Sequence, residues 1–285
     1  MKMNLVLQGP AQCSTDKLEH IAAIADPARI VTLADGAVRA EDVEAGERVR
    51  AAVSMVAFPA GVDANFIGAE RTLADFKLVA MDMDSTLITI ECIDEIADMQ
   101  GLKAQVSEIT EAAMRGELDF AASLARRVAL LEGLDASALE RVYEERLRLS
   151  PGAETMLAGV KAAGLKTLLV SGGFTFFTER LQQRLGLDFS HANVLEVREG
   201  KLTGKVVGGI VDALEKKRTV ERVCAELGIA PHQAIVMGDG ANDLQMMSIA
   251  GLSVAFRAKP VVRVQTNIAL NFSGLDALLT ILAES

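Results

Sequence analysis

Five short apolar runs recur between residues 76 and 272, and they constrain the fold of this 285-residue chain more than any other feature. Longer stretches of helical spacing separate the runs, which read "FKLVAMD", "LKTLLVSGG", "QAIVMGDG", "LSVAF" and "NIALNF". Strands buried on both faces of a parallel sheet have this continuous apolar composition. We therefore predict an α/β fold with a Rossmann-like core, in which parallel strands alternate with helices.

Two segments of the core depart from this alternation. Residues 88–150 are rich in Ala, Leu, Glu and Arg at helical spacing, which predicts a helical cap inserted between the first and second strands. The stretch "NVLEVREGKLTGKVVGGIV" predicts a β-hairpin around Glu199 and Gly200. The core should therefore carry a cap and a hairpin.

The amino-terminal residues 1–72 predict a separate small α/β domain, which leaves residues 73–285 for the core with its cap. The stretches "LVLQG", "ARIVTLADG" and "VRAAVSMVAF" favour strands, and "TDKLEHIAAIA" favours a helix. These residues contain no evident constellation of site-like side chains. A packing domain without a ligand therefore stays open beside a regulatory domain.

Charge and composition exclude several classes of partner. The formal net charge of −10 opposes binding to a phosphate backbone, so we expect no nucleic-acid partner. No apolar stretch approaches the 18 or so residues that span a bilayer, and we expect a cytoplasmic protein without a membrane contact. Three lone cysteines and three scattered histidines provide neither a disulfide framework nor a zinc motif.

Four aspartates follow two of the predicted strands. Asp82 and Asp84 lie in "VAMDMDSTLITIEC", where an extended chain would point both carboxylates to the same side. Asp239 and Asp243 lie in "VMGDGANDLQMM". The carboxyl ends of parallel strands meet at one edge of the sheet, where such a cluster of charge requires a cation. Ligands that are all oxygen atoms favour Mg²⁺ over zinc.

Two further elements have the chemistry of an anion site. Ser171 ends another strand, and its hydroxyl and the amides of Gly172 and Gly173 can donate hydrogen bonds to a phosphate group. Lys216 and Lys217 lie near the start of the predicted helix "KKRTVERVCAEL", and one of them could neutralise a phosphoryl oxygen.

These motifs, in this order, resemble the four motifs of the haloacid dehalogenase superfamily. They are DxDxT at 82–86, Ser-Gly-Gly at 171–173, a downstream lysine, and GDGxND at 238–243, and the resemblance covers residues 76–272. Within the superfamily, "ECIDEIA", "GELDFAASLARRVALL" and "AGLSVAFRAKP" resemble the phosphoserine phosphatases. The resemblance implies hydrolysis of L-phosphoserine to L-serine and phosphate, the last step of serine biosynthesis.

The resemblance also implies the catalytic roles. Asp82 would attack phosphorus and become an aspartyl phosphate, and Asp84 would protonate the leaving serine and later deprotonate water. Mg²⁺ would be held by the side chain of Asp82, the backbone carbonyl of Asp84 and Asp239. Asp243 would act as a ligand or as a support for the ligands.

The substrate contacts are implied in the same way. Arg127 would bind the substrate carboxylate and Glu91 its ammonium group, while Lys216, with Lys217 as the alternative, would hold phosphoryl oxygens. The residues placed around the substrate are Glu91, Met114, Phe120, Arg127, Ser171, Gly172, Lys216 and Asn242. Met114 and Phe120 would belong to the cap and help to exclude water.

The amino-terminal domain resembles the ACT type in its predicted order of elements. That resemblance implies amino-acid binding or a homodimer formed through this domain. Two other functions stay open for the whole chain. One is a superfamily phosphatase or phosphotransferase that acts on another small phosphomonoester, and the other is an amino-acid-sensing module with an inactive core.

Overall fold

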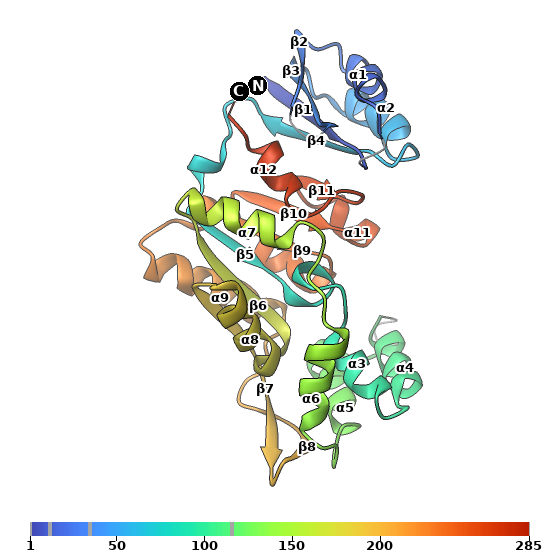
Figure 1. Cartoon of the computed structure of the whole chain (residues 1–285), viewed down its shortest axis with the longest axis vertical. Coiled ribbons are helices and arrows are strands. Elements are labelled where there is room, and N and C mark those ends of the chain that lie inside the picture. Colours follow the sequence, from blue (N-terminus) through green and yellow to red (C-terminus); the bar gives the residue numbers. More distant parts are fainter. Residues whose placement is uncertain (1, 11–12, 34–35, 115–116, 285) are drawn as a thin grey trace.

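The computed structural model describes residues 2–10, 13–33, 36–114 and 117–284, and the side chain of Met114 lies outside the described part. Two β-sheets organise the described residues (Figure 1). The smaller sheet belongs to the amino-terminal domain, and the larger sheet runs through the rest of the chain. The two chain ends lie close together beside the amino-terminal domain (Figure 1).

The amino-terminal domain has the order β-α-β-β-α-β. Its elements are β1 (Met3–Gln8), α1 (Thr15–Ala23), β2 (Arg29–Thr32), β3 (Val38–Val43), α2 (Glu47–Ala57) and β4 (Asp63–Gly68). The strands are antiparallel in the order β2-β3-β1-β4. This is the arrangement of ferredoxin-like domains.

The prediction of a strand over "VRAAVSMVAF" is wrong, because most of these residues form helix α2. Val53 and Ala57 lie four residues apart and are buried, whereas the side chains of Met55 and Val56 are exposed. This burial pattern has the period of a helix. The valines suggested a strand, but the packing of one helix face overrides their intrinsic preference.

The larger sheet has the order β11-β10-β9-β5-β6-β7-β8 in the described residues. Its strands are β5 (Leu78–Met81), β6 (Lys166–Phe174), β7 (Phe189–Arg198), β8 (Lys201–Val207), β9 (Ala234–Gly238), β10 (Leu252–Phe256) and β11 (Ile268–Leu270). Neighbouring strands are parallel except β7 and β8, which form an antiparallel hairpin. The predictions of a parallel core and of this hairpin are confirmed.

Helices cover both faces of the larger sheet. They are α7 (Ala153–Ala162), α8 (Thr175–Leu185), α9 (Ala213–Glu226), α10 (Leu244–Met247), α11 (Pro260–Arg263) and α12 (Ala277–Ile281). In β5, Val79 and Met81 join the core that includes α7 and α8, while Leu78 and Ala80 join the core that includes α9 and α10. Burial on both faces explains the continuous apolar runs.

The cap leaves the core after β5 and returns before α7. It contains α3 (Cys92–Asp98), α4 (Lys103–Met114), α5 (Phe120–Ala129) and α6 (Ser137–Arg141), and it lies at the side of the molecule opposite the amino-terminal domain (Figure 1). Ile88 and Leu149 form an antiparallel bridge where the two connecting segments meet. None of the helices in the described ranges is long and apolar enough to cross a membrane.

The two domains meet along the edge strand β11. The buried carboxylate of Asp63 accepts hydrogen bonds from the backbone N–H groups of residues 271–273 at 2.7 to 3.1 Å. The amide of Asn65 donates to the carbonyl of Ala269 at 3.2 Å and accepts from its N–H at 2.8 Å. Side chains of β4 thus satisfy backbone groups that an open sheet edge would expose.

Candidate active site

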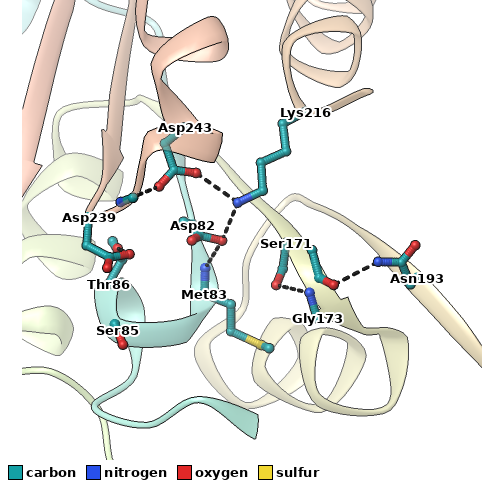
Figure 2. A network of polar contacts seen from close by, with 12 residues as sticks. Asp82, Met83, Ser85, Thr86, Ser171, Gly173, Asn193, Lys216, Asp239 and Asp243 are labelled. Carbon is teal, nitrogen blue, oxygen red and sulfur yellow. Dashed lines mark hydrogen bonds and ion pairs between the residues drawn. The ribbon is translucent and has the colours of Figure 1, made fainter. Parts of the chain in front are cut away.

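Three carboxylates gather at the carboxyl ends of β5 and β9 (Figure 2). Asp82 follows β5, Asp239 follows β9, and Asp243 ends the short helical turn Ala241–Asp243. One oxygen atom from each of these aspartates lies within 4.8 Å of the others. Three oxygen donors at such separations can hold a metal ion.

The turn after β5 points Asp84 into the same region. β5 ends one residue before Asp82, so strand periodicity does not bring the two carboxylates together as expected. Instead, the chain turns sharply at Ser85, which has a φ of 55°, in the left-handed region that few residues other than glycine adopt. The backbone N–H of Cys92 donates to Asp84 at 3.0 Å and fixes its carboxylate.

Lys216 is the cation beneath this cluster. Its buried ammonium donates to Asp82 at 2.7 Å and to Asp243 at 2.8 Å (Figure 2). Burial alone would lower the pKa of Lys216, but the two aspartates outweigh it, so the pKa is raised and the charge is kept. Lys217, the alternative, lies 3.8 Å from Glu221 on the outer side of α9. The geometry therefore brings Lys216, and not Lys217, to the cluster.

The carboxylates remain crowded despite this lysine. Burial raises the pKa of Asp84 to about 7, and the charge of Glu91 adds to the effect. Burial, followed by the charges of Asp243 and Glu91, raises the pKa of Asp239 to about 7. The pKa of Asp82 is also raised well above its ordinary value, first by burial and then by Asp243. A bound cation would relieve this excess of negative charge.

The Ser-Gly-Gly segment lies near the end of β6, beside these aspartates. The N–H of Gly173 donates to the buried hydroxyl of Ser171 at 2.8 Å (Figure 2). A Cβ atom on Gly173 would lie 2.8 Å from a carboxylate oxygen of Asp84, and one on Gly172 would lie 3.0 Å from the ring of Phe120. Glycines thus allow the backbone to approach both the turn that carries Asp84 and the cap.

A cavity of about 630 Å³ opens above the cluster, between the core and the cap. Glu91, Arg127 and Phe120 line it from the cap side. The Nε atom of Arg127 is buried and has no hydrogen-bond partner among the described residues. Glu91 accepts a hydrogen bond from the hydroxyl of Ser85 at 2.6 Å, and burial raises its pKa. The cavity is thus lined by side chains of opposite charge, Glu91 and Arg127.

Most of the predicted site residues meet at this cavity. The predicted residues that line it are Asp82, Asp84, Glu91, Phe120, Arg127, Gly172, Asp239 and Asn242. Ser171, Lys216 and Asp243 are buried beside its floor. Met114 ends α4, but its side chain lies outside the described part of the structure, so its predicted contact stays a prediction.

Two charged residues of the cavity were missed by the sequence-based prediction. Asp94 lies one helical turn after Glu91, so helical spacing could have found it. Lys259 follows the end of β10, and the rule that ligands bind at the carboxyl ends of parallel strands could have found it. The charge of Lys259 lowers the pKa of Glu91, although burial outweighs this effect.

Comparisons with known proteins agree with this geometry. Residues 76–251 match the haloacid dehalogenase-like hydrolases. A phosphoserine phosphatase from a Polaromonas species is 56% identical over 224 residues, which cover 77% of this chain and 95% of the relative. A HAD family hydrolase from Salmonella enterica subsp. enterica serovar Typhi superimposes with a TM-score of 0.90 at 32% identity and covers 100% of both chains.

A second solved structure carries the same two-domain arrangement. A probable phosphoserine phosphatase from Vibrio cholerae superimposes with a TM-score of 0.83 at 33% identity and covers 99% of this chain and 86% of that chain. The match of fold therefore extends beyond the catalytic core. The chain belongs to the haloacid dehalogenase-like hydrolases and, among them, to the phosphoserine phosphatase family.

Proposed function

We propose that this protein hydrolyses L-phosphoserine to L-serine and phosphate, the last step of serine biosynthesis. The observation that carries the proposal is that Arg127 and Glu91 line the same cavity as Asp82 and Asp84. Phosphoserine carries a phosphate, a carboxylate and an ammonium group. Each of these groups has a complementary partner in that one cavity.

Arg127 and Glu91 give the site its selectivity for an amino acid. The guanidinium has a buried Nε–H without a partner in the described structure, which a substrate carboxylate can satisfy. Glu91 offers a carboxylate to the substrate ammonium. Leaving either charge unpaired in this cavity is costly, so esters that lack the amino-acid groups should be poor substrates.

Asp82 serves as the nucleophile in this proposal. One of its oxygens attacks phosphorus, the bond from phosphorus to the serine oxygen breaks, and an aspartyl phosphate forms. Asp84 gives its proton to the departing serine oxygen. The resulting Asp84 carboxylate then takes a proton from the water that attacks phosphorus, which releases phosphate and restores Asp82. A pKa near 7 suits both of these roles of Asp84.

Mg²⁺ is the metal ion that suits this site. The donor atoms are carboxylate oxygens, and neither histidine nor cysteine joins the described cluster. Asp82, Asp239 and the backbone carbonyl of Asp84 would hold the ion. Asp243 already bonds Lys216 and the N–H of Gly240, so it would act as a support. The bound ion would supply positive charge for the phosphoryl oxygens.

The remaining residues hold the phosphoryl group and exclude water. Ser171 and Gly172 donate hydrogen bonds to its oxygens, and Lys216 neutralises their charge. Asn242 lines the cavity between Asp239 and Asp243 in the sequence, and it would contact the phosphoryl group. Phe120 lines the cap side of the cavity, and Met114 is predicted to join it there, which would strengthen each electrostatic interaction inside.

Phosphate release from a panel of esters tests the proposal. The panel contains L-phosphoserine, phosphothreonine and a sugar phosphate, each assayed with Mg²⁺ and with a chelator. We expect Mg²⁺-dependent release with a strong preference for L-phosphoserine. Preference for another phosphomonoester would keep the mechanism and reject the roles of Glu91 and Arg127. Tight serine binding without any phosphate release would favour a sensor instead.

The amino-terminal domain and the cellular location complete the proposal. We propose that this domain is ACT-like and forms a homodimer through α2 and the residue that follows it, where Met55, Val56 and Phe58 expose apolar surface. Light scattering of the wild type and of Met55→Glu would test this, with a monomeric wild type contradicting it. We also propose a cytoplasmic location, which agrees with the free thiols of the described cysteines.

A further inference from the structure

Asn193 lies on β7 behind the Ser-Gly-Gly segment and outside the lining of the active-site cavity. Its side chain is 1% exposed and makes two hydrogen bonds of 2.8 Å, of which Figure 2 shows the one from its amide nitrogen. The amide nitrogen donates to the carbonyl of Gly172, and the amide oxygen accepts from the N–H of Val211. Asn193 thus connects Gly172 of β6 with Val211, which lies in the segment before α9.

The bond from Asn193 to Gly172 stands in for a backbone hydrogen bond at a place where β6 and β7 do not pair regularly. β6 and β7 pair regularly up to Val170 and His191, and they pair again at Phe174 and Asn193. Between these pairs, residues 171–173 of β6 face a single residue of β7, so the segment bulges out of the ladder. A backbone carbonyl in such a bulge loses its partner, and the side chain of Asn193 supplies one.

The peptide between Gly172 and Gly173 is consequently held at both ends. Its carbonyl accepts from Asn193, and its N–H donates to the hydroxyl oxygen of Ser171 at 2.8 Å. Two successive glycines would otherwise leave this peptide free to rotate. Because the Ser171 oxygen already accepts a hydrogen bond, its own proton remains available to donate toward the cavity.

The second bond connects the same amide to the helix that carries Lys216. Val211 precedes Asp212, the N-cap residue of α9, whose side chain accepts from the N–H of Glu215 at 2.8 Å. Lys216 then lies in the first turns of that helix. The hydrogen bond from Val211 to Asn193 therefore holds the start of α9 in place relative to the bulge of β6.

We infer that Asn193 is a positioning residue for phosphoryl transfer, which holds the Ser171–Gly172 donors and the start of the Lys216 helix in one fixed arrangement. The inference rests on the proposed function, because it assigns these donors to the phosphoryl oxygens. Asn193 itself touches neither the cavity nor the reacting atoms. Its effect is to keep preorganised donors aimed at the place where charge develops.

Asn193→Asp tests this role with little change in shape. The aspartate keeps an acceptor for Val211 but removes the donor to Gly172 and places an oxygen against its carbonyl. We expect kcat/KM for L-phosphoserine to fall roughly 100-fold, as misplacement by about 1 Å can produce. We also expect weaker competitive inhibition by inorganic phosphate, which a purely structural role would leave unchanged.

Asn65→Asp is the matched control. Asn65 is also buried and also bonds one carbonyl and one N–H, but at the domain contact remote from the site. We expect it to lower the melting temperature while kcat/KM and phosphate inhibition per folded molecule stay as in the wild type. If Asn193→Asp does not fold, Asn193→Ala, which introduces no charge, is measured in the same assays.

A double variant checks that Asn193 acts through the donors. In a Ser171→Ala background, Asn193→Asp should lower kcat/KM much less than in the wild type, because the positioned hydroxyl is already gone. Wild-type activity for Asn193→Asp, or additive losses in the double variant, would overturn the inference and leave the proposed function intact. Absence of phosphate release by the wild type would overturn both.

Discussion

Asp63 at the domain contact and Asp82 in the active site are both almost fully buried, at 1% and 4% exposure, yet their surroundings are opposite. Asp63 is surrounded by backbone N–H groups that satisfy its oxygens. Asp82 instead shares its space with Asp239, Asp243 and one lysine, and its pKa is raised. A carboxylate satisfied by amides holds structure together, whereas crowded carboxylates create a place for a cation and for chemistry.

The replacement Asp82→Asn gives the largest effect that this comparison predicts. We expect kcat to fall by roughly 10⁴-fold or more, because the amide cannot act as the nucleophile. The melting temperature should change little, since the replacement removes one negative charge from a cluster that has an excess of them. Phosphate release and thermal melting measure both quantities. Substantial activity in this variant would contradict the assignment of the nucleophile.

Removal of the metal ion is expected to have the next largest effect. A chelator should lower activity by roughly 10³-fold, equivalent to several kcal/mol of lost charge stabilisation. Added Mg²⁺ should restore activity. It should also raise the melting temperature of the wild type more than that of Asp82→Asn, because it binds the folded state through that residue. Equal stabilisation of both proteins would place the ion elsewhere.

The matched replacement Asp63→Asn should show the opposite pattern to Asp82→Asn. The amide has a single acceptor oxygen and would turn N–H donors toward backbone N–H groups. We expect a loss of about 3 kcal/mol in the free energy of unfolding, since buried donors are left without partners. Denaturant unfolding measures this loss. Activity per folded molecule should remain close to wild type, and a catalytic defect would break the comparison.

Arg127→Ala tests whether the charged groups of the cavity, unlike the carboxylate at the domain contact, bind a substrate. With the guanidinium removed, kcat/KM for L-phosphoserine should fall roughly 30-fold, or about 2 kcal/mol, as a buried charged hydrogen bond is lost. Turnover of a phosphate ester without a carboxylate should change much less. The exposed neighbour Arg126→Ala is the control and should behave as the wild type. Equal losses for both esters would show that Arg127 does not bind the substrate carboxylate.

Asp188 gives the smallest effect and a defined dependence on pH. Its carboxylate accepts from the N–H and hydroxyl of Thr167 and pairs with Lys166. Burial opposes these partners, but together they lower the pKa of Asp188 below the ordinary 3.8. The lowered pKa means that its stabilisation is complete above pH 4 to 5 and disappears as the pH falls through the folded pKa.

Asp188→Asn should therefore cost about 1 kcal/mol of unfolding free energy near pH 7. Denaturant unfolding from pH 7 to pH 2.5 should show this difference shrinking as the pH falls. A difference that stays constant over this range would mean that the charge of Asp188 is unimportant.

The sequence predicted the parts of the site that follow strands and carry motifs. Asp82, Ser171 and Asp239 each come directly after an apolar run, so their convergence follows from parallel topology alone. The choice between Lys216 and Lys217 needed the phase of α9, which depends on where its N-cap begins. Asn193 belongs to no motif, and its role arises from a break in strand pairing that no residue pattern announces.

The errors of the sequence-based prediction also arise where tertiary structure, and not a residue pattern, decides the conformation. Strand periodicity predicted a shared environment for Asp82 and Asp84, but β5 ends before both, and Asp84 reaches the cavity through a turn at Ser85 whose conformation its residue type does not indicate. Helix α2 was mistaken for a strand, since its apolar content is similar in both structures and only tertiary packing decides between them.

The bridge between Ile88 and Leu149 allows substrate selectivity to change in evolution without a change in the reaction. The chain leaves and re-enters the core at adjacent points, so the helices after Cys92, whose N–H holds Asp84, can differ in length and shape while both connections to the core stay in place. Arg127 and Phe120 lie inside this insert, whereas Asp82 and Asp239 lie outside it. Descendants of such a chain can exchange the helices after Cys92 and acquire a new substrate while the carboxylates that follow the strands stay in place.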